Sequence, residues 1–265
     1  MSDLPRDKAY AVVTGASRGL GRDLALSLSA RGYHTILVGT GERIQEVCAE
    51  IRKRYHTESV GYAVDLSKED EVLAFAAEVN AKYEVSVLVN NAGVGGTRGF
   101  ADAPVTYLDN IINLNVRCVA LLTHELLPNL LRQPKSHILN VGSMAAHTPT
   151  GFKTVYPASK SFVLSFSLGL REELRGTPVT VSVCSPGAMA TNPEVTARIQ
   201  RQGVLGRLTL KSTSHIARKC VRQMLWGKRL IVFTPVTYLV SRLVPNFIKT
   251  PVLSRIVRRE LRQEE

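Results

Sequence analysis

The sequence of 265 residues lacks several features that would indicate particular protein classes. No stretch of about 18 or more uncharged apolar residues occurs, so no membrane-spanning helix is expected. The first ten residues, MSDLPRDKAY, lack an apolar segment, so no secretory signal is expected there. The cysteines form no CxxC pair, which argues against a metal site and a disulfide framework. They lie among apolar residues and are expected to be core thiols of a reducing, cytoplasmic compartment: Cys48, Cys118, Cys184 and Cys220.

Acidic residues are missing from Val195 to Arg259. Residues 195–265 contain 15 Lys/Arg against 3 Asp/Glu, which equals the whole net charge of +12. This tail is therefore the part of the chain with a preference for anionic partners. Aromatic residues are scarce (6%) and no nucleic-acid-binding motif accompanies the charge, so nucleic acid is not expected as a partner.

Short apolar runs alternate with segments of helical periodicity along most of the chain. The runs that predict strands are Ala9–Thr14, Thr35–Val38, Ser59–Val64, Val85–Val89, Ser136–Val141, Val179–Cys184 and Leu230–Phe233. Helices are expected after the first strand, from Ser67, and over Arg43–Arg54, Val105–Leu131 and Tyr156–Arg175. This alternation predicts one α/β domain of the doubly wound Rossmann type, with a mostly parallel sheet and helices on both faces.

A glycine-rich loop, Thr14–Gly21, joins the first expected strand to the first expected helix. Glycines let the chain turn sharply and let backbone N–H groups approach a phosphate closely. The amino end of the helix adds unpaired donors and a positive dipole end. Because the loop lies between a strand and an amphipathic helix, we interpret it as a dinucleotide pyrophosphate site rather than as a tight packing turn.

The end of the second strand indicates which dinucleotide is bound. A carboxylate there usually binds the ribose hydroxyls of NAD, but this sequence has Gly39 in that place. Arg18 lies in the glycine loop, and Thr40 and Arg43 lie near the adenosine end. A guanidinium without a competing carboxylate suits a 2′-phosphate, which favours NADP(H). Glu42 leaves NAD(H) as the alternative, if the loop is shifted by a few residues.

Tyr156 and Lys160 are spaced i and i+4, which places them on one face of a helix. An ammonium beside a phenol favours the phenolate and is expected to lower the pKa of Tyr156 toward working pH. Ser143 ends the fifth expected strand, and sites in open parallel sheets form at the carboxyl ends of strands. Its hydroxyl can donate a hydrogen bond to a substrate oxygen.

Together these motifs resemble the short-chain dehydrogenase/reductase family, of the type called classical. The matching elements, in chain order, are Thr14–Gly21 as TGxxxGxG, Asp65, Asn90–Gly93 as NNAG, Asn115, Ser143, Tyr156-x-x-x-Lys160 and Pro186-Gly187. They extend over residues 9–191. The resemblance implies a seven-stranded sheet, hydride transfer between a nicotinamide and a ketone or secondary alcohol, and assembly as a homo-oligomer.

The resemblance also implies the roles of four catalytic residues. Tyr156 gives or takes the proton, and Ser143 holds the reacting oxygen. Lys160 binds the nicotinamide ribose and lowers the pKa of Tyr156, while Asn115 holds a water in the proton relay behind Lys160. An intact set of these residues argues against the alternative of a non-catalytic dinucleotide sensor or scaffold.

The implied cofactor contacts are distributed along the chain. Asp65 is expected at the adenine, Asn91 beside the cofactor channel, and Pro186, Gly187 and Thr191 at the nicotinamide. The whole expected cofactor set is Gly15, Ser17, Arg18, Gly19, Leu20, Gly21, Thr40, Arg43, Asp65, Asn91, Ala92, Gly93, Tyr156, Lys160, Pro186, Gly187 and Thr191. No metal site is expected.

Substrate identity depends on the two segments that are hardest to interpret. Residues 192–214 have irregular patterning and are expected to form a substrate loop. Residues 236–265 form a basic amphipathic extension in place of the Asp-Gly-Gly ending of many relatives. This extension is expected to pack on the domain or a second subunit, to lie on an anionic membrane, or to bind an acidic carrier. Acyl thioesters, steroids and keto-lipids all remain candidate substrates, with reduction favoured.

Overall fold

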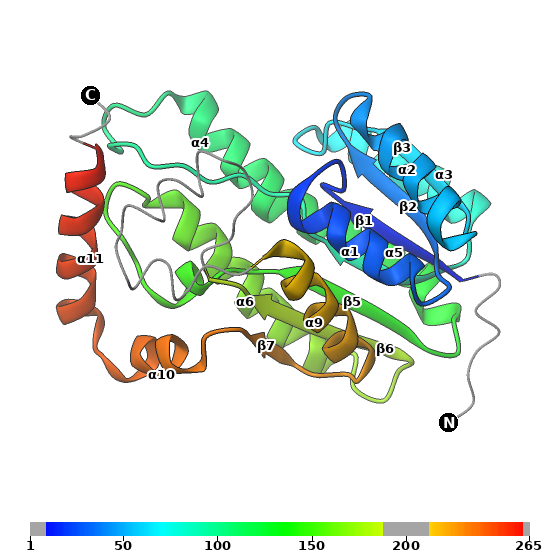
Figure 1. The fold of residues 1–265 in the computed structure, drawn as a ribbon. Coiled ribbons are helices and arrows are strands. Elements are labelled where there is room, and N and C mark those ends of the chain that lie inside the picture. Colours follow the sequence, from blue (N-terminus) through cyan, green and yellow to red (C-terminus); the bar gives the residue numbers. More distant parts are fainter. Residues whose placement is uncertain (1–8, 188–211, 262–265) are drawn as a thin grey trace.

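The computed structural model describes residues 9–187 and 212–261 of the chain. Seven strands form one sheet in the order β3-β2-β1-β4-β5-β6-β7, and every pairing is parallel (Figure 1). The strands are β1 Tyr10–Thr14, β2 His34–Gly39, β3 Ser59–Ala63, β4 Val85–Asn90, β5 Ser136–Val141, β6 Val179–Ser185 and β7 Leu230–Val232. The predicted doubly wound α/β fold with seven strands is therefore confirmed.

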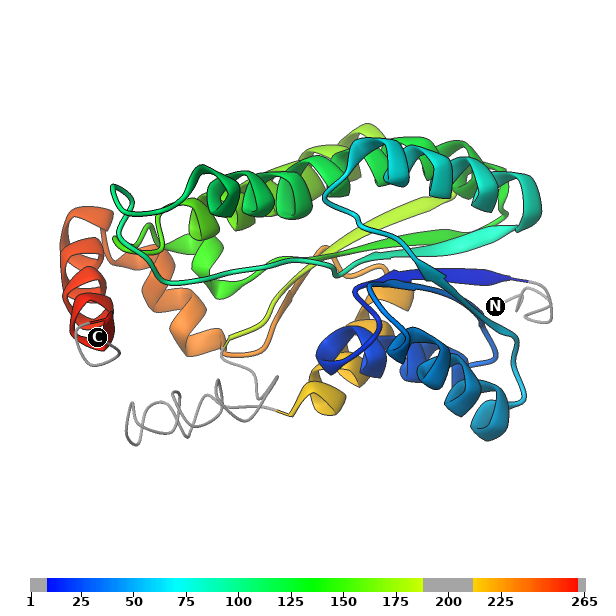
Figure 2. The same ribbon diagram turned by 90° about the horizontal axis from the view of Figure 1, so that it is seen from above.

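Helices cover both faces of the sheet (Figure 2). On one face lie α1 Gly19–Ser29, α2 Arg43–Tyr55 and α9 Thr213–Leu225; on the other lie α3 Glu69–Lys82, α4 Val105–Ile112, α5 Cys118–Arg132 and α6 Val155–Glu173. Successive strand residues point to opposite faces, so Ala11 and Val13 enter the core beneath α1 while Val12 enters the opposite core. Both faces are buried, which explains the continuous apolar runs in the sequence.

The chain reverses its winding direction between β1 and β4, which are neighbours in the sheet. Ligands of open parallel sheets bind in the crevice outside the carboxyl ends of strands at such a switch point. The glycine loop follows β1 and the NNAG segment follows β4, so both predicted motifs lie at this crevice.

The helix predicted over Val105–Leu131 is divided into three parts. Between α4 and α5, the segment Asn113–Arg117 (η2) forms a π-helical turn, and α5 continues to Arg132. Such wide turns occur frequently at functional sites. Here the turn carries Asn115, whose side chain accepts a hydrogen bond from Val94 N (2.9 Å) and donates one to Val94 O (2.8 Å). Apolar spacing alone could not reveal this turn, because it depends on a contact with a distant loop.

The four cysteines are buried and free, as expected for core thiols. Among the described residues, no group of His, Cys, Asp and Glu side chains is suited to a metal ion. The described helices also include none with the length and hydropathy required to span a bilayer. Residues 192–211 of the predicted substrate loop (192–214) lie outside the described residues. Its last two positions belong to α9. Ser212 caps this helix by accepting a hydrogen bond from His215 N.

His137 makes the stability of the folded protein depend on pH. It lies in β5 between Val87 and Thr180 and is 3% exposed. Burial, with a smaller effect of the Lys135 charge, lowers the pKa of His137 to about 4. The unfolded chain binds a proton near pH 6.5 and the folded chain does not, so stability falls as the pH drops from 6.5 to 4. The free energy of unfolding should decrease by about 3 kcal/mol over this range.

A His137→Val substitution should remove this part of the pH dependence, because valine suits a buried strand and has no proton to bind. Urea unfolding of both proteins between pH 4 and 7 measures the difference. His124→Gln is the matched control, since the His124 side chain is 81% exposed. An unchanged slope in the His137→Val protein would contradict the prediction.

Candidate active site

Glycines shape the loop between β1 and α1. Gly15 and Gly19 have φ values of +64° and +58°, a conformation that side chains disfavour. A Cβ atom on Gly21 would lie 2.1 Å from the backbone oxygen of Gly15. The loop therefore folds back onto the first turn of α1, and the backbone at Gly19 faces open space, with no heavy atom within 4 Å of a Cβ placed there.

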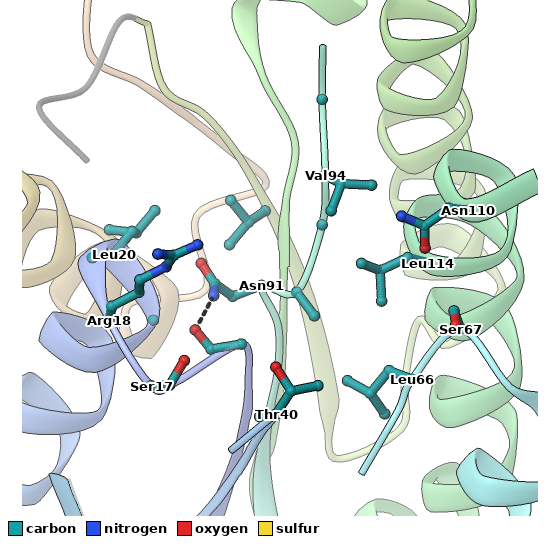
Figure 3. Close-up of a pocket in the computed structure, with 18 of the residues that line it drawn as sticks. Ser17, Arg18, Leu20, Thr40, Leu66, Ser67, Asn91, Val94, Asn110 and Leu114 are labelled. Carbon is teal, nitrogen blue, oxygen red and sulfur yellow. Dashed lines mark hydrogen bonds between the residues drawn. The ribbon is translucent and has the colours of Figure 1, made fainter. Parts of the chain in front are cut away.

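The segment after β4 is hydrogen-bonded to this loop. Asn91 donates through Nδ2 to the backbone oxygens of Thr14 (2.8 Å) and Gly15 (3.2 Å). The Thr14 hydroxyl accepts hydrogen bonds from the N–H groups of Asn91 and Ala92, both at 2.9 Å. Figure 3 shows Asn91 between the glycine loop and the opposite wall of the pocket. These bonds fix the positions of the carboxyl ends of β1 and β4 relative to each other.

A cavity of about 460 Å³ opens at this crevice. Its size is within the usual range for ligand pockets. Most of the predicted cofactor residues line it: Gly15, Ser17, Arg18, Gly19, Leu20, Gly21, Thr40, Asp65, Asn91, Ala92, Gly93, Tyr156 and Lys160. The structure thus brings the glycine loop, the NNAG segment and the Tyr156–Lys160 pair to one cavity.

Three of the described residues that were predicted to contact the cofactor do not line this cavity: Arg43, Pro186 and Gly187. Arg43 is exposed at the start of α2, and Thr191 lies outside the described residues. Pro186 and Gly187 follow β6 next to Ser143, because Met144 N donates to Pro186 O (3.0 Å). Ser143 itself also lies beside the cavity rather than in its wall. The prediction for Arg43 is therefore not supported by its position in the fold.

The cavity wall contains further residues that the sequence analysis did not name as cofactor ligands: Gly39, Val64, Leu66, Ser67, Val94, Gly95, Asn110, Leu114, Val141 and Gly142. Most of them lie at the end of a strand or in the loop that follows it, so their positions near strand ends were a usable signal. Asn110 and Leu114 are different, since they reach the cavity from α4 and the π-helical turn. Figure 3 shows these two on the side opposite Arg18.

Tyr156 lies in the first turn of α6, beside Ser143. Burial raises the pKa of Tyr156, and a hydrogen bond with Ser143 acts in the opposite direction. A Cβ on Gly95 would lie 3.1 Å from the Tyr156 ring, so this glycine allows the loop to pass close to the ring. Ser143 caps the short helix η3, Met144–His147, by accepting a hydrogen bond from Ala145 N (3.1 Å).

Lys160 is 6% exposed, and its ammonium donates to the Val141 carbonyl oxygen (3.0 Å). Burial lowers the pKa of Lys160 to about 8. The expected lowering of the Tyr156 pKa by Lys160 is not found, since the Tyr156 pKa is raised. The i, i+4 spacing places both residues at the cavity, but the burial of the phenol outweighs its hydrogen bond with Ser143.

Asn115 connects the π-helical turn to α6. Besides its bonds to Val94, its Nδ2 donates to Ser159 Oγ (3.0 Å), and Ser159 Oγ donates to Tyr156 O (2.8 Å). A Cβ on Gly93 would lie 2.9 Å from Asn115 Oδ1 and 3.3 Å from Lys160 Nζ. The side chains of Asn115 and Lys160 thus occupy the space that Gly93 leaves free.

The end of the cavity where the adenine is expected is formed by the segments after β2 and β3. Asp65 Oδ1 accepts hydrogen bonds from Ser67 N (3.0 Å) and Ser67 Oγ (2.7 Å), which lower the pKa of the carboxyl group. Ser67 therefore does not start a helix, and α3 begins at Glu69. Gly39 and Thr40 also line the cavity, and Figure 3 shows Thr40 below Arg18.

The residues of this cavity fit a nicotinamide dinucleotide, which the resemblance implies. The open space at Gly19 and the amino end of α1 suit the pyrophosphate. A side chain at Gly21 would push the Gly15 backbone out of place. Asp65 keeps Oδ2 available for a donor at the adenine end, and Lys160 Nζ can donate to ribose hydroxyls.

The C-terminal helices pack beside the segment between Ser143 and Tyr156. The helices α10 (Pro235–Leu243) and α11 (Asn246–Leu261) contact the segment between Ser143 and Tyr156. The His147 ring lies edge-on to Tyr238, with ring centroids 5.1 Å apart. The N–H of Gly151 donates to Ser254 Oγ (2.8 Å). Packing of the extension on its own domain, one of the three expected arrangements, is therefore observed for one side of these helices.

Comparisons with known proteins agree with this geometry. The model of the short chain dehydrogenase family matches residues 9–202. A very-long-chain 3-oxoacyl-CoA reductase of Laccaria bicolor is 34% identical over 177 residues, which are 65% of this chain and 52% of that protein. The chain thus spans about half the length of that relative.

Two solved structures are similar in fold. A metagenomic short-chain oxidoreductase in complex with NADP is 35% identical and has a TM-score of 0.64, over 68% of this chain and 82% of that chain. A 7beta-hydroxysteroid dehydrogenase structure has a TM-score of 0.81 at 20% identity, over 95% of this chain and 97% of that chain. The family model, the sheet order and the cavity residues together show that this chain belongs to the short-chain dehydrogenase/reductase family.

Proposed function

We propose that this protein is an NADP(H)-dependent oxidoreductase that transfers a hydride between the nicotinamide and a ketone or secondary alcohol, with reduction favoured. The observation that carries the proposal is the position of Tyr156, Ser143 and Lys160. All three lie at the carboxyl end of the sheet, with Tyr156 and Lys160 in the wall of a cavity built from dinucleotide-binding motifs.

The chemistry follows from the donors at this site. The reduced nicotinamide supplies the hydride when it is bound. Tyr156 donates a proton to the carbonyl oxygen as charge develops there, and Ser143 donates a hydrogen bond to the same oxygen. The raised pKa of Tyr156 keeps the phenol protonated before reduction, which suits a proton donor. Asn115 and Ser159 position the backbone of Tyr156 through their hydrogen bonds, and the buried Lys160 lies at the same cavity as the second ionisable group.

The preference for NADP(H) over NAD(H) rests on the adenosine end of the cavity. Arg18 is the one arginine among the described residues that line it. Gly39 offers no carboxylate to the ribose hydroxyls, and Glu42 is absent from the described cavity wall. A guanidinium paired with a 2′-phosphate forms strong, charge-assisted hydrogen bonds. The oxidoreductase that is 35% identical to this chain was solved with NADP, which supports the same preference.

A hydrophobic or acyl-type ketone is the proposed substrate class. The matched relative from Laccaria bicolor reduces very-long-chain 3-oxoacyl-CoA, according to its name. NADPH oxidation, followed by absorbance, should be measured with 3-oxoacyl thioesters of increasing chain length and with small polar ketones. Faster turnover with longer chains supports the proposal. Turnover of polar ketones alone would contradict the substrate class, and no NADPH oxidation with any carbonyl would contradict the reductase activity.

Arg18→Ala tests the cofactor preference. Removing the guanidinium should weaken NADPH binding by roughly 10- to 100-fold, because a charge-assisted hydrogen bond contributes about 1.5–3 kcal/mol. NADH binding should change by less than about twofold, since NADH has no 2′-phosphate for Arg18 to bind. Fluorescence titration of the purified variant with both dinucleotides measures the two effects.

Arg43→Ala distinguishes the two arginines that the sequence analysis named. Arg43 is exposed at the start of α2, away from the cavity wall. If NADPH binding is weakened by Arg43→Ala and not by Arg18→Ala, the assignment of the phosphate to Arg18 is wrong. Equal loss of NADPH and NADH in the Arg18→Ala protein would indicate a role in the loop itself.

A further inference from the structure

The helices α10 and α11 lie together at one end of the molecule, next to the carboxyl ends of the strands (Figures 1 and 2). α10 follows β7 directly, so it starts at the same edge as the loops of the candidate active site. α11 then passes beside Gly151 and Phe152, where the guanidinium of Arg258 lies 5.0 Å from the centre of the Phe152 ring. A ligand surface on these helices is therefore close to the loop between Ser143 and Tyr156.

The sides of these helices that face the protein are largely polar. In α10, Tyr238 contacts His147 and Ser241 donates to Tyr238 O (2.7 Å). In α11, Lys249 donates to His147 O (3.0 Å) and Ser254 accepts from Gly151 N. Val257 is the one apolar side chain of α11 in the described core, with 8% exposure. This arrangement differs from that of an ordinary surface helix, which buries its apolar side.

The opposite sides are apolar and exposed. We call these residues the C-terminal apolar face: Val236, Leu239, Val240, Leu243, Phe247, Ile248, Val252, Leu253 and Ile256. The α10 members are spaced 236, 239, 240, 243, which is one continuous stripe of a helix. Leu243 is 71% and Phe247 78% exposed. Exposed apolar side chains gathered in this way mark a surface that meets another apolar phase.

Basic side chains accompany this face, and their charge indicates what covers it. Arg242, Arg255 and Arg259 are exposed on the same two helices. The sequence contains no acidic residue from 195 to 259, and the positions after 259 add only Glu260, Glu264 and Glu265. A second copy of the chain would bring two strongly basic surfaces together, which like charges oppose. An anionic and apolar partner is complementary to both properties.

We propose that α10 and α11 bind the surface of an anionic lipid bilayer, with the C-terminal apolar face in the acyl-chain boundary and the arginines at the headgroups. Both helices lie in the interface, and neither crosses it. The docked orientation places the loop between Ser143 and Tyr156, which contains His147 and Phe152, near the bilayer. The binding itself does not rest on the proposed reductase activity.

Sedimentation with lipid vesicles tests the proposal. The full chain should bind vesicles that contain phosphatidylglycerol at least about tenfold more strongly than vesicles of phosphatidylcholine alone, because each arginine near an anionic surface contributes about fivefold. An Arg255→Gln/Arg259→Gln variant should lose on the order of tenfold of this binding. A Leu243→Ser/Phe247→Ser variant should lose on the order of tenfold or more, since two apolar side chains leave the membrane.

The matched control is Trp226→Ser. Trp226 is 76% exposed but precedes β7, at the amino end of the strands and far from α10 along the sheet. This variant should bind vesicles as the parent does. Circular dichroism and NADPH titration show whether each variant is folded, so a folding defect is separated from a loss of lipid contact.

Three results would overturn the proposal: no binding to anionic vesicles, unchanged binding of the Leu243→Ser/Phe247→Ser variant, or an equal loss in Trp226→Ser. A parent dimer that becomes monomeric in the Leu243→Ser/Phe247→Ser variant, without vesicle binding by the parent, would instead assign the face to a second copy. Tyr156→Phe should bind vesicles normally, so failure of the membrane proposal and failure of the proposed activity give different results.

Discussion

A Tyr156→Phe variant should lose turnover by a factor of about 10² to 10⁴ while it keeps its affinity for NADPH. The substitution removes the hydroxyl that we propose gives the proton to the substrate oxygen. Phenylalanine preserves the ring, which packs against the backbone near Gly95, so the loop beside the cavity should keep its position. Steady-state kinetics gives the loss in kcat, and fluorescence titration measures NADPH binding.

Tyr107→Phe is a suitable control for this experiment. Tyr107 lies in α4 near Gly96, with the Arg98 guanidinium 5.5 Å from the centre of its ring, and it is outside the described cavity wall. Its turnover should stay within about twofold of the parent. Full turnover by Tyr156→Phe would refute the assigned proton donor, and it would favour the alternative in which the protein only binds the dinucleotide.

A Gly21→Ala substitution should destabilise the protein by at least about 3 kcal/mol and abolish measurable NADPH binding. The new Cβ would lie 2.1 Å from the Gly15 carbonyl oxygen and 2.5 Å from Asn91 Nδ2. Because the first of these atoms belongs to the backbone, the clash moves the loop in which we propose that the pyrophosphate binds. Urea unfolding gives the loss of stability, and a titration gives the loss of binding.

Gly169→Ala provides the matched comparison. Gly169 lies in an exposed position of α6, and a Cβ placed there has no heavy atom within 4 Å. Alanine has a lower entropic cost than glycine in a helix, so this variant should be about 0.5–1 kcal/mol more stable than the parent. If Gly21→Ala were as stable as the parent and bound NADPH, the tight contact between the loop and α1 would be wrong.

Local patterns in the sequence were sufficient to predict the sheet. Its central strands are short apolar runs buried on both faces, and the parallel arrangement follows from the helices between the strands. The glycine loop, the NNAG segment and the Tyr156–Lys160 pair were also readable, because each depends on residues that are near one another in the chain. Their common location at strand ends follows from the topology rule for open sheets.

The assignment of individual cofactor residues was less complete. Arg18 and Arg43 are both basic and both near a strand end, but only Arg18 lines the cavity. The difference depends on how the segment after β2 turns into α2, which spacing does not show. Asn110 and Leu114 were missed for a related reason, since they reach the cavity only because α4 continues into a π-helical turn.

The sequence by itself determined the family, the α/β sheet, the dinucleotide motifs and the basic character of the tail, because these depend on short-range spacing and composition. Only the tertiary structure decided the electrostatics of the site and the orientation of the tail. Burial raises the pKa of Tyr156 and lowers that of Lys160, and burial is set by residues far away in the chain. In the same way, Lys249 and Ser254 contact the segment between Ser143 and Tyr156, so the apolar sides of α10 and α11 face outward. Helical periodicity alone could not indicate this orientation.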